Sequence, residues 1–167
     1  MIFCVPYAYD RPKQGQVGGT IVRCNTLISE MDLRGGDCWD CRFILSAGFT
    51  KESVNHPTKQ VGQAMAVQMA DYINSVRNYK CHTTQKYTWG TYAETKEAAS
   101  WLCYGDHIFV STNLGHMPRV MLCWWFLKPR WCKVTFIPAN HSFTRKEYWQ
   151  ETIKFFTYLY RFLLKKW

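Results

Sequence analysis

Strand and helix signals alternate along the whole chain, and this alternation restricts the fold more than any other feature of the sequence. Five short apolar or β-branched runs have the length of buried strands and lie at 2–5, 42–46, 79–84, 107–112 and 132–137. Helical patterns cover 20–31, 61–76, 91–104 and 117–128, and a last one begins near residue 144. The order predicts an α/β fold with a mainly parallel sheet of about five strands and helices on both faces.

Two capping sequences mark expected helix starts. Residues 91–94 and 144–147 both read Thr-x-x-Glu, the spacing of a reciprocal capping box, so we expect each helix to begin at its threonine. The first of these helices is expected to run to about Tyr104. Pro138 is expected to end the last strand, because proline cannot donate to a strand ladder.

The C-terminal helix combines an apolar stripe with a polar face. The apolar stripe comprises Trp149, Ile153, Phe156, Tyr160 and Leu163, widened by Phe155 and Phe162. The polar face comprises Glu147, Glu151, Lys154, Tyr158, Arg161 and Lys165. We expect the apolar stripe to dock on the rest of the domain. Contact with a membrane surface is the alternative, because the aromatic stripe is wide and the chain ends in Lys-Lys-Trp.

Length and composition point to one folded domain. A chain of 167 residues can bury one good core, and an aromatic content of 17% is typical of folded rather than disordered chains. The longest apolar runs fall short of the roughly 20 residues that span a bilayer, and no basic leader precedes the first strand. We therefore expect a single cytoplasmic domain over residues 1–167.

Positive charge is concentrated near the C-terminus. The chain has a net charge of +9, and residues 128–167 hold nine Lys or Arg side chains against two acidic ones. Such an excess attracts nucleic acid, acidic lipid or a phosphorylated substrate. A solvated helix face is the alternative explanation.

Eight cysteines are present, and without a secretory signal we expect them to be reduced. Only Cys38 and Cys41 have the spacing of a metal or redox pair. A structural zinc site needs a second pair of ligands, and no second CxxC or HxxxH exists, so no metal site is predicted. A metal or redox role and a purely structural role for this pair both stay open.

The segment from Ile108 to Arg119 carries the strongest functional signal. A buried strand enters a turn of small residues, and the next helix opens with His116, Met117, Pro118 and Arg119. Pro fits a first helical turn, and helix N-termini attract anions. We predict that Arg119 binds an anionic group and that His116 is a catalytic acid or base. Alternatively, His116 caps the helix and Arg119 pairs with a surface acid.

Other candidate ligand-binding residues follow from sheet geometry. In open parallel sheets, ligands bind beyond the carboxyl ends of the strands. The loops after the expected strands begin near residues 6, 46, 85 and 112, and the first contains a glycine-rich stretch before a helix. This rule adds five candidate ligand-binding residues: Ser46, Gly48, Glu94, Thr95 and Ser111. Capping alone is the alternative explanation for Glu94.

Four segments of the sequence resemble the YdcF/SanA/ElyC-like family of Rossmann-like bacterial proteins. Residues 43–48 resemble its strand followed by Ser-Gly-Gly, 63–66 its second helix, 94–99 its Asn-Thr-x-Glu-Asn-Ala segment and 111–122 its Ser-x-x-x-His-Met-x-Arg-Ala signature. The chain has Gln63 where the family has an acidic residue, and Val-Pro-Tyr-Ala where it has Leu-Gly-Gly. The resemblance implies a three-layer Rossmann-like sandwich and a nucleotide-like ligand or S-adenosylmethionine.

These observations lead to one function hypothesis and one alternative. The first is a protein that binds a small phosphate-bearing or nucleotide-like anion at the carboxyl edge of its sheet, and that acts, if it is an enzyme, as a phosphoester hydrolase or transferase. The alternative is a non-enzymatic basic module that binds nucleic acid or acidic membrane through residues 128–167.

Overall fold

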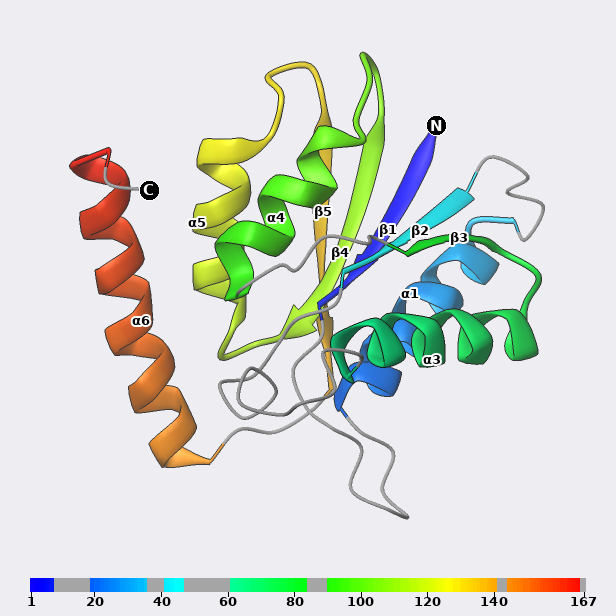
Figure 1. Cartoon of the computed structure of the whole chain (residues 1–167), viewed down its shortest axis with the longest axis horizontal. Coiled ribbons are helices and arrows are strands. Elements are labelled where there is room, and N and C mark those ends of the chain that lie inside the picture. The colour runs from blue at the N-terminus through cyan, green and yellow to red at the C-terminus, as the bar shows by residue number, and fades with distance from the viewer. Residues whose placement is uncertain (8–18, 36–40, 47–60, 84–89, 141–143, 166–167) are drawn as a thin grey trace.

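Five parallel strands form one sheet at the centre of the molecule (Figure 1). The structure is a computed structural model that describes residues 1–7, 19–35, 41–46, 61–83, 90–140 and 144–165. In spatial order the strands are β3 (Lys80–Thr83), β2 (Cys41–Leu45), β1 (Ile2–Pro6), β4 (His107–Asn113) and β5 (Lys133–Ala139). This arrangement confirms the predicted α/β fold with a five-stranded parallel sheet.

Helices cover both faces of the sheet. On one face lie α1 (Gly19–Leu33) and α3 (Val61–Val76), and on the other lie α4 (Gly90–Ser100) and α5 (Met117–Leu127) (Figure 1). The central strands are buried on both sides, which is why β1, β2 and β4 read as continuous apolar runs rather than alternating ones. The three layers confirm the Rossmann-like sandwich.

Side chains from alternate strand positions pack into two separate hydrophobic cores, one on each face of the sheet. Cys4, Phe43 and Phe109 point toward α1 and α3, and they pack with Leu27 and Ile73. The intervening positions point toward α4 and α5, where Val5, Ile44, Ile108 and Val110 pack with Trp124. The same alternation decides on which side of the sheet each polar residue at the strand ends lies.

Two element boundaries differ from the expectation. Helix α4 ends at Ser100 rather than near Tyr104, because the chain turns there toward β4. Strand β5 continues through Pro138 and pairs it with Thr112 of β4. Strand β5 lies at the edge of the sheet and pairs with β4 alone, which is the position where a strand tolerates proline.

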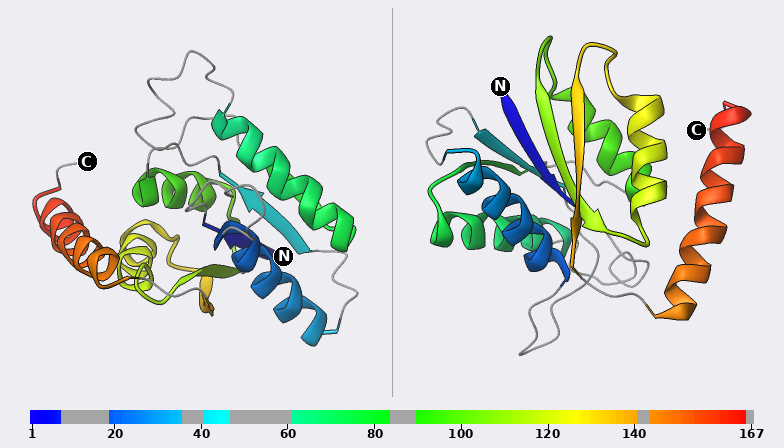
Figure 2. Two further views of the ribbon diagram at one scale, coloured as in Figure 1. Left: turned by 90° about the horizontal axis from the view of Figure 1, so that it is seen from below. Right: turned by 180° about the vertical axis from the view of Figure 1, so that it is seen from behind.

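The last helix, α6 (Arg145–Leu163), lies outside α5 as an additional layer (Figure 2). The predicted capping box at its start is confirmed, because Thr144 accepts from the Glu147 N–H and the Glu147 carboxylate accepts from the Thr144 N–H. No helix in the described parts of the chain is long and apolar enough to cross a membrane.

The orientation of α6 is opposite to the predicted one. The stripe that was expected to dock lies in solvent, with its five residues between 52% and 68% exposed: Trp149, Ile153, Phe156, Tyr160 and Leu163. The helix instead turns Glu151 toward the domain, where it pairs with the buried Arg119 of α5. A buried cation without an anion is strongly destabilising, and this accounts for the orientation of Glu151 toward Arg119.

Candidate functional site

The strand order defines where a ligand site is expected. Successive strands run outward from β1 through β2 to β3, and the chain then returns to place β4 on the other side of β1. In such sheets the ligand crevice lies at the carboxyl ends of the two strands where the order reverses. Here those ends are Tyr7, directly after β1, and Asn113, the last residue of β4.

His116 connects α4 to β4 through two hydrogen bonds on the α4–α5 side of the sheet. Its Nε2 lies 2.9 Å from the Thr91 hydroxyl, and its Nδ1 lies 3.0 Å from the Thr112 hydroxyl. Burial lowers the pKa of His116 well below its usual 6.5, and the positive charges of Arg119 and Arg23 lower it further. The imidazole is therefore neutral at physiological pH.

Thr91 does not have the capping role that its sequence context suggests. Helix α4 begins at Gly90, so Thr91 lies in the first turn, and its hydroxyl bonds His116 rather than the Glu94 N–H. Gly90 has a φ of 69°, a left-handed conformation that glycine adopts without strain, and it lies close to Tyr158 of α6. The capping explanation of Glu94 is wrong for the same reason.

Thr95 fixes the side chain of Tyr7. The Thr95 hydroxyl donates to the Thr91 carbonyl oxygen at 2.6 Å, so it accepts from the Tyr7 hydroxyl. Tyr7 and Thr95 are fully buried, and burial raises the pKa of Tyr7 well above 10. Thr95, predicted to touch a ligand, therefore holds the residue that follows β1 in place.

Arg23 and Asn113 form a polar contact on the α1 side of the same crevice. The guanidinium of Arg23 donates through Nε and one terminal nitrogen to the Asn113 Oδ1, at 2.8 and 2.6 Å. It also donates to the carbonyl oxygen of Tyr7. Tyr7 thus links the two sides, because its carbonyl contacts Arg23 and its hydroxyl contacts Thr95.

Five buried polar atoms have no hydrogen-bond partner among the described residues: the His82 Nε2 of β3, the Trp124 Nε1 of α5 and three atoms at the carboxyl ends of β2 and β4. These three are the Ser46 Oγ directly after β2, the Ser111 Oγ near the end of β4 and the Asn113 Nδ2 at its end. Leaving such a group unsatisfied costs about 1–3 kcal/mol, so native proteins keep few of them. The three that lie at the carboxyl ends of β2 and β4 make this edge of the sheet a candidate for ligand binding.

Glu94 is the acidic group of this region. It is buried on α4, and burial raises its pKa to about 7, against the opposing effect of the Arg119 and Arg23 charges. Its carboxyl group makes no hydrogen bond with another described residue. A carboxyl group that is half ionised at neutral pH can accept or donate a proton.

Arg119 is directed toward α6 rather than toward the strand ends. Its Nε and a terminal nitrogen both lie 2.9 Å from the Glu151 carboxylate, which also accepts from Lys154 at 2.8 Å. The Tyr158 ring stacks below its guanidinium, 5.2 Å from the ring centre. The predicted alternative, pairing with an acid, is therefore realised, but the acid is buried rather than at the surface.

The predicted site residues fall into three groups. Thr95, Glu94 and His116 lie together on the α4–α5 side, and Ser46 points to that same face from the end of β2. Ser111 points to the opposite face, toward α1. Gly48 lies outside the described residues, as do most of the loops after β1, β2 and β3.

Arg23 and Asn113 are not among the residues predicted from the sequence, although the pattern of α1 contains an indication for Arg23. Helix α1 buries a stripe at positions 20, 24, 27, 28 and 31, and position 23 falls within it. A cation in the middle of a buried helical stripe requires polar partners from another element. The sequence alone does not indicate that this partner is the amide of Asn113.

The cysteine pair is described only in part. Cys38 lies outside the described residues, and Cys41 begins β2 with its sulfur 3.5 Å from that of Cys4. Within the described ranges, no three Cys, His, Asp or Glu side chains gather as metal ligands would. Burial raises the pKa values of Cys24 and Cys123 to about 12, so these two thiols are protonated and unreactive.

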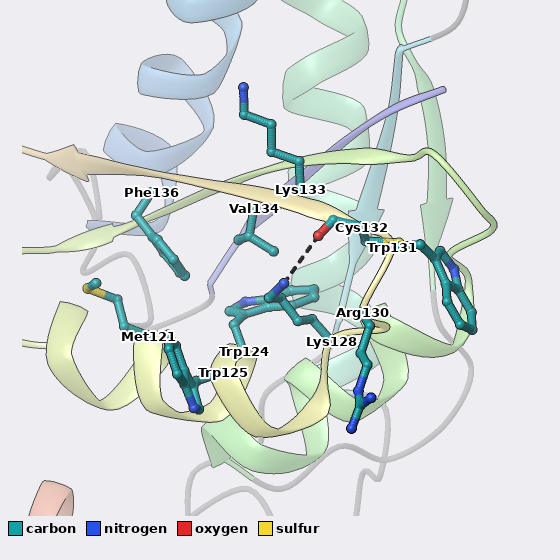
Figure 3. Close-up of a pocket in the computed structure, with 10 residues that line it drawn as sticks. All are labelled: Met121, Trp124, Trp125, Lys128, Arg130, Trp131, Cys132, Lys133, Val134 and Phe136. Carbon is teal, nitrogen blue, oxygen red and sulfur yellow. Dashed lines mark hydrogen bonds between the residues drawn. The ribbon is translucent and has the colours of Figure 1, made fainter.

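A separate cavity of about 560 Å³ lies between α5 and β5, away from the predicted site (Figure 3). Trp124, Val134 and Phe136 form much of its wall, and Lys128 reaches across to donate to the Cys132 carbonyl oxygen at 3.3 Å. Figure 3 shows Lys133 pointing away on the other side of the strand. None of the predicted catalytic or ligand-binding residues lines this cavity, although seven of its ten lining residues belong to the basic segment 128–167.

Comparisons with protein-family models, with curated proteins and with solved structures give no match. The resemblance to the YdcF/SanA/ElyC-like family therefore stays a prediction. Fold and site geometry together define a class: a Rossmann-like α/β protein with a buried, positively charged polar cluster at the carboxyl ends of β1 and β4.

Proposed function

We propose that this protein binds a small phosphate-bearing or nucleotide-like anion at the carboxyl ends of β1 and β4. The Arg23 and Arg119 charges both act on this region, as their effects on the pKa values of His116 and Glu94 indicate. Electrostatic attraction of this kind favours an anionic ligand over a neutral one. S-adenosylmethionine, which carries a cationic sulfonium, fits this field less well than a phosphate ester does.

The amide of Asn113 is the observation that carries the proposal. Arg23 holds its oxygen, and its nitrogen is fully buried without a partner among the described residues. The amide therefore presents two N–H donors in a fixed direction at the point where the strand order reverses. A phosphate or carboxylate oxygen of a ligand would accept from them and remove the cost of an unsatisfied donor.

If the protein is an enzyme, its reaction is phosphoester hydrolysis or transfer with Glu94 as the proton carrier. A group with a pKa of about 7 is half ionised at neutral pH, whereas the neutral His116 has both nitrogens in hydrogen bonds with threonine hydroxyls. His116 then acts as a positioning residue that joins α4 to β4. Its predicted role as the proton carrier stays a prediction.

Replacing the amide nitrogen of Asn113 by an oxygen tests the binding proposal. In Asn113→Asp, a carboxylate oxygen still accepts from Arg23, but the two N–H donors become an oxygen that repels anions. Thermal-shift measurements with inorganic phosphate, AMP, ATP, a sugar phosphate and S-adenosylmethionine should show stabilisation of the wild-type protein by at least one phosphate compound. The same compound should not stabilise Asn113→Asp.

The matched control is Asn25→Asp. Asn25 lies on α1, and its amide oxygen accepts a hydrogen bond from the hydroxyl of Tyr72 on α3 at 2.6 Å. It carries the same change of charge and should keep the ligand-induced shift. Equal shifts in Asn113→Asp and the wild-type protein would refute the assignment of the site.

A further inference from the structure

We propose that the outward face of α6 docks on the surface of an anionic lipid bilayer. This outward face comprises Trp149, Ile153, Phe156, Tyr160, Leu163 and Leu164, each of which is exposed. The residues recur every three or four positions, so they form one continuous stripe over four turns of the helix. The inference is independent of the proposed ligand site.

The stripe is exposed because the opposite side of α6 is already occupied. That side carries Glu151, which pairs with Arg119, and Phe162, whose ring stacks on Phe126 at a centroid distance of 4.4 Å. Phe162 also contacts Tyr92 of α4 at 5.7 Å. Rotating α6 to bury the stripe would break these contacts, so the two faces of the helix have separate partners.

The position of α6 in the molecule also favours a flat partner. Helix α6 forms the outermost layer on its side of the molecule, and the rest of the domain lies behind it (Figures 1 and 2). A convex helix with a wide aromatic and aliphatic face is the geometry of a helix that lies in the plane of a membrane interface. Trp149 and Tyr160 are the residue types that prefer the headgroup region of a bilayer.

The charges around the stripe select an anionic surface. Arg145 and Lys146 lie one helical turn before Trp149, and Lys165 directly follows Leu164, so exposed cations lie at both ends of the stripe. The two acids of α6 are engaged elsewhere. Glu151 is buried against Arg119 and Lys154, and Glu147 is held in the capping box at the helix start.

A second copy of the chain and a nucleic acid fit this surface less well. Two copies meeting through α6 would bring the cations at the ends of both stripes together, which like-charge repulsion opposes. Nucleic-acid surfaces combine basic side chains with aromatic stacking platforms, whereas here Ile153, Leu163 and Leu164 give much of the face an aliphatic character. Acidic phospholipid satisfies both the charge and the aliphatic surface.

Vesicle co-sedimentation tests the proposal with the full chain. The wild-type protein should sediment with vesicles of phosphatidylcholine mixed with phosphatidylglycerol, and not with phosphatidylcholine alone. Two substitutions on the stripe, Phe156→Ser with Tyr160→Ser, should weaken binding by about tenfold or more, since binding follows buried apolar area. The control Tyr104→Ser removes a still more exposed aromatic from the turn before β4 and should bind like wild type.

Two double charge-reversal variants separate the contribution of electrostatic attraction to membrane binding from that of apolar contact. Lys146→Glu with Lys165→Glu should also reduce binding to anionic vesicles, whereas Lys80→Glu with Lys133→Glu, which changes the net charge equally on exposed strand residues, should not. Circular dichroism checks that each variant is folded. Tryptophan fluorescence should shift to the blue on binding in the wild-type protein.

Three outcomes would overturn the proposal. One is the absence of sedimentation with anionic vesicles, and another is equal binding by the stripe variant. The third is a concentration-dependent dimer, seen by light scattering, that the stripe variant abolishes, because that result assigns the face to a second copy.

Discussion

The carboxyl edge of the sheet and the outer face of α6 both depart from the usual distribution of polar and apolar side chains, but in opposite ways. At the sheet edge, charged and polar side chains such as Arg23, Asn113 and Glu94 are buried, whereas on α6 large apolar side chains such as Trp149 and Phe156 are exposed. Each departure lowers stability or solubility unless a partner is present. This difference is the basis of the two proposals, a small polar ligand at the sheet edge and an extended apolar surface at α6.

The ion pair between Arg119 and Glu151 joins the two regions, and breaking it should have the largest effect. Glu151→Ala leaves the Arg119 guanidinium buried without its carboxylate, which should lower the free energy of unfolding by about 3–5 kcal/mol. Chemical denaturation followed by circular dichroism measures this loss.

The matched control for that variant is Glu30→Ala, which breaks the exposed pair with Arg34 and should cost less than about 1 kcal/mol. The double variant Arg119→Met with Glu151→Leu should recover much of the lost stability, because both charges are then absent. A small effect of Glu151→Ala would show that α6 is attached through its aromatic contacts instead, and the two regions would then be uncoupled.

Protonation of Glu94 should give the second-largest effect. Its pKa is about 7 in the folded protein against 4.5 for an ordinary glutamate, so the folded state binds the proton more tightly than the unfolded state. Stability should therefore decrease as the pH rises from about 4.5 to above 7, by about 3 kcal/mol in total, and then level off. Denaturation midpoints measured across this range give the slope.

The difference between wild type and Glu94→Gln isolates this contribution. His116 acts in the opposite direction: its pKa is lowered, so its contribution to stability is lost as the pH falls below 6.5. Glu94→Gln leaves that behaviour unchanged and should remove only the decrease toward neutral pH. An unchanged pH profile in Glu94→Gln would mean that the carboxyl group is ionised in the fold, and the proposed proton carrier would be lost.

Sequence reasoning succeeded where a single periodicity decided the structure. The apolar runs of β1, β2 and β4 predict a parallel sheet, because strands covered on both sides have no polar face. Reasoning failed for α6 because its sequence contains two stripes, and the partner that decides between them, Arg119, lies on another helix. Arg23 and Asn113 are 90 residues apart, so their contact depends on the strand order and leaves no local pattern.

Removing the Ser111 hydroxyl should have the smallest effect and gives the sharpest test of the sheet edge. This hydroxyl is fully buried and has no partner among the described residues, so Ser111→Ala should raise the free energy of unfolding by up to about 1 kcal/mol. The same variant should weaken binding of the phosphate compound found by thermal shift, because stability gained at a binding site is commonly accompanied by loss of function.

Ser100→Ala is the reference for Ser111→Ala, because the exposed Ser100 hydroxyl donates to the Glu97 carbonyl oxygen at 2.6 Å and its loss should be neutral or slightly destabilising. On α6, Phe156→Ser should leave the unfolding free energy nearly unchanged, since an exposed side chain contributes little to the fold. Destabilisation by both Ser111→Ala and Phe156→Ser would mean that each side chain already has its partner within the chain. A gain at Ser111 with no change at Phe156 is the result expected if each region keeps its unusual residues for a partner outside the chain.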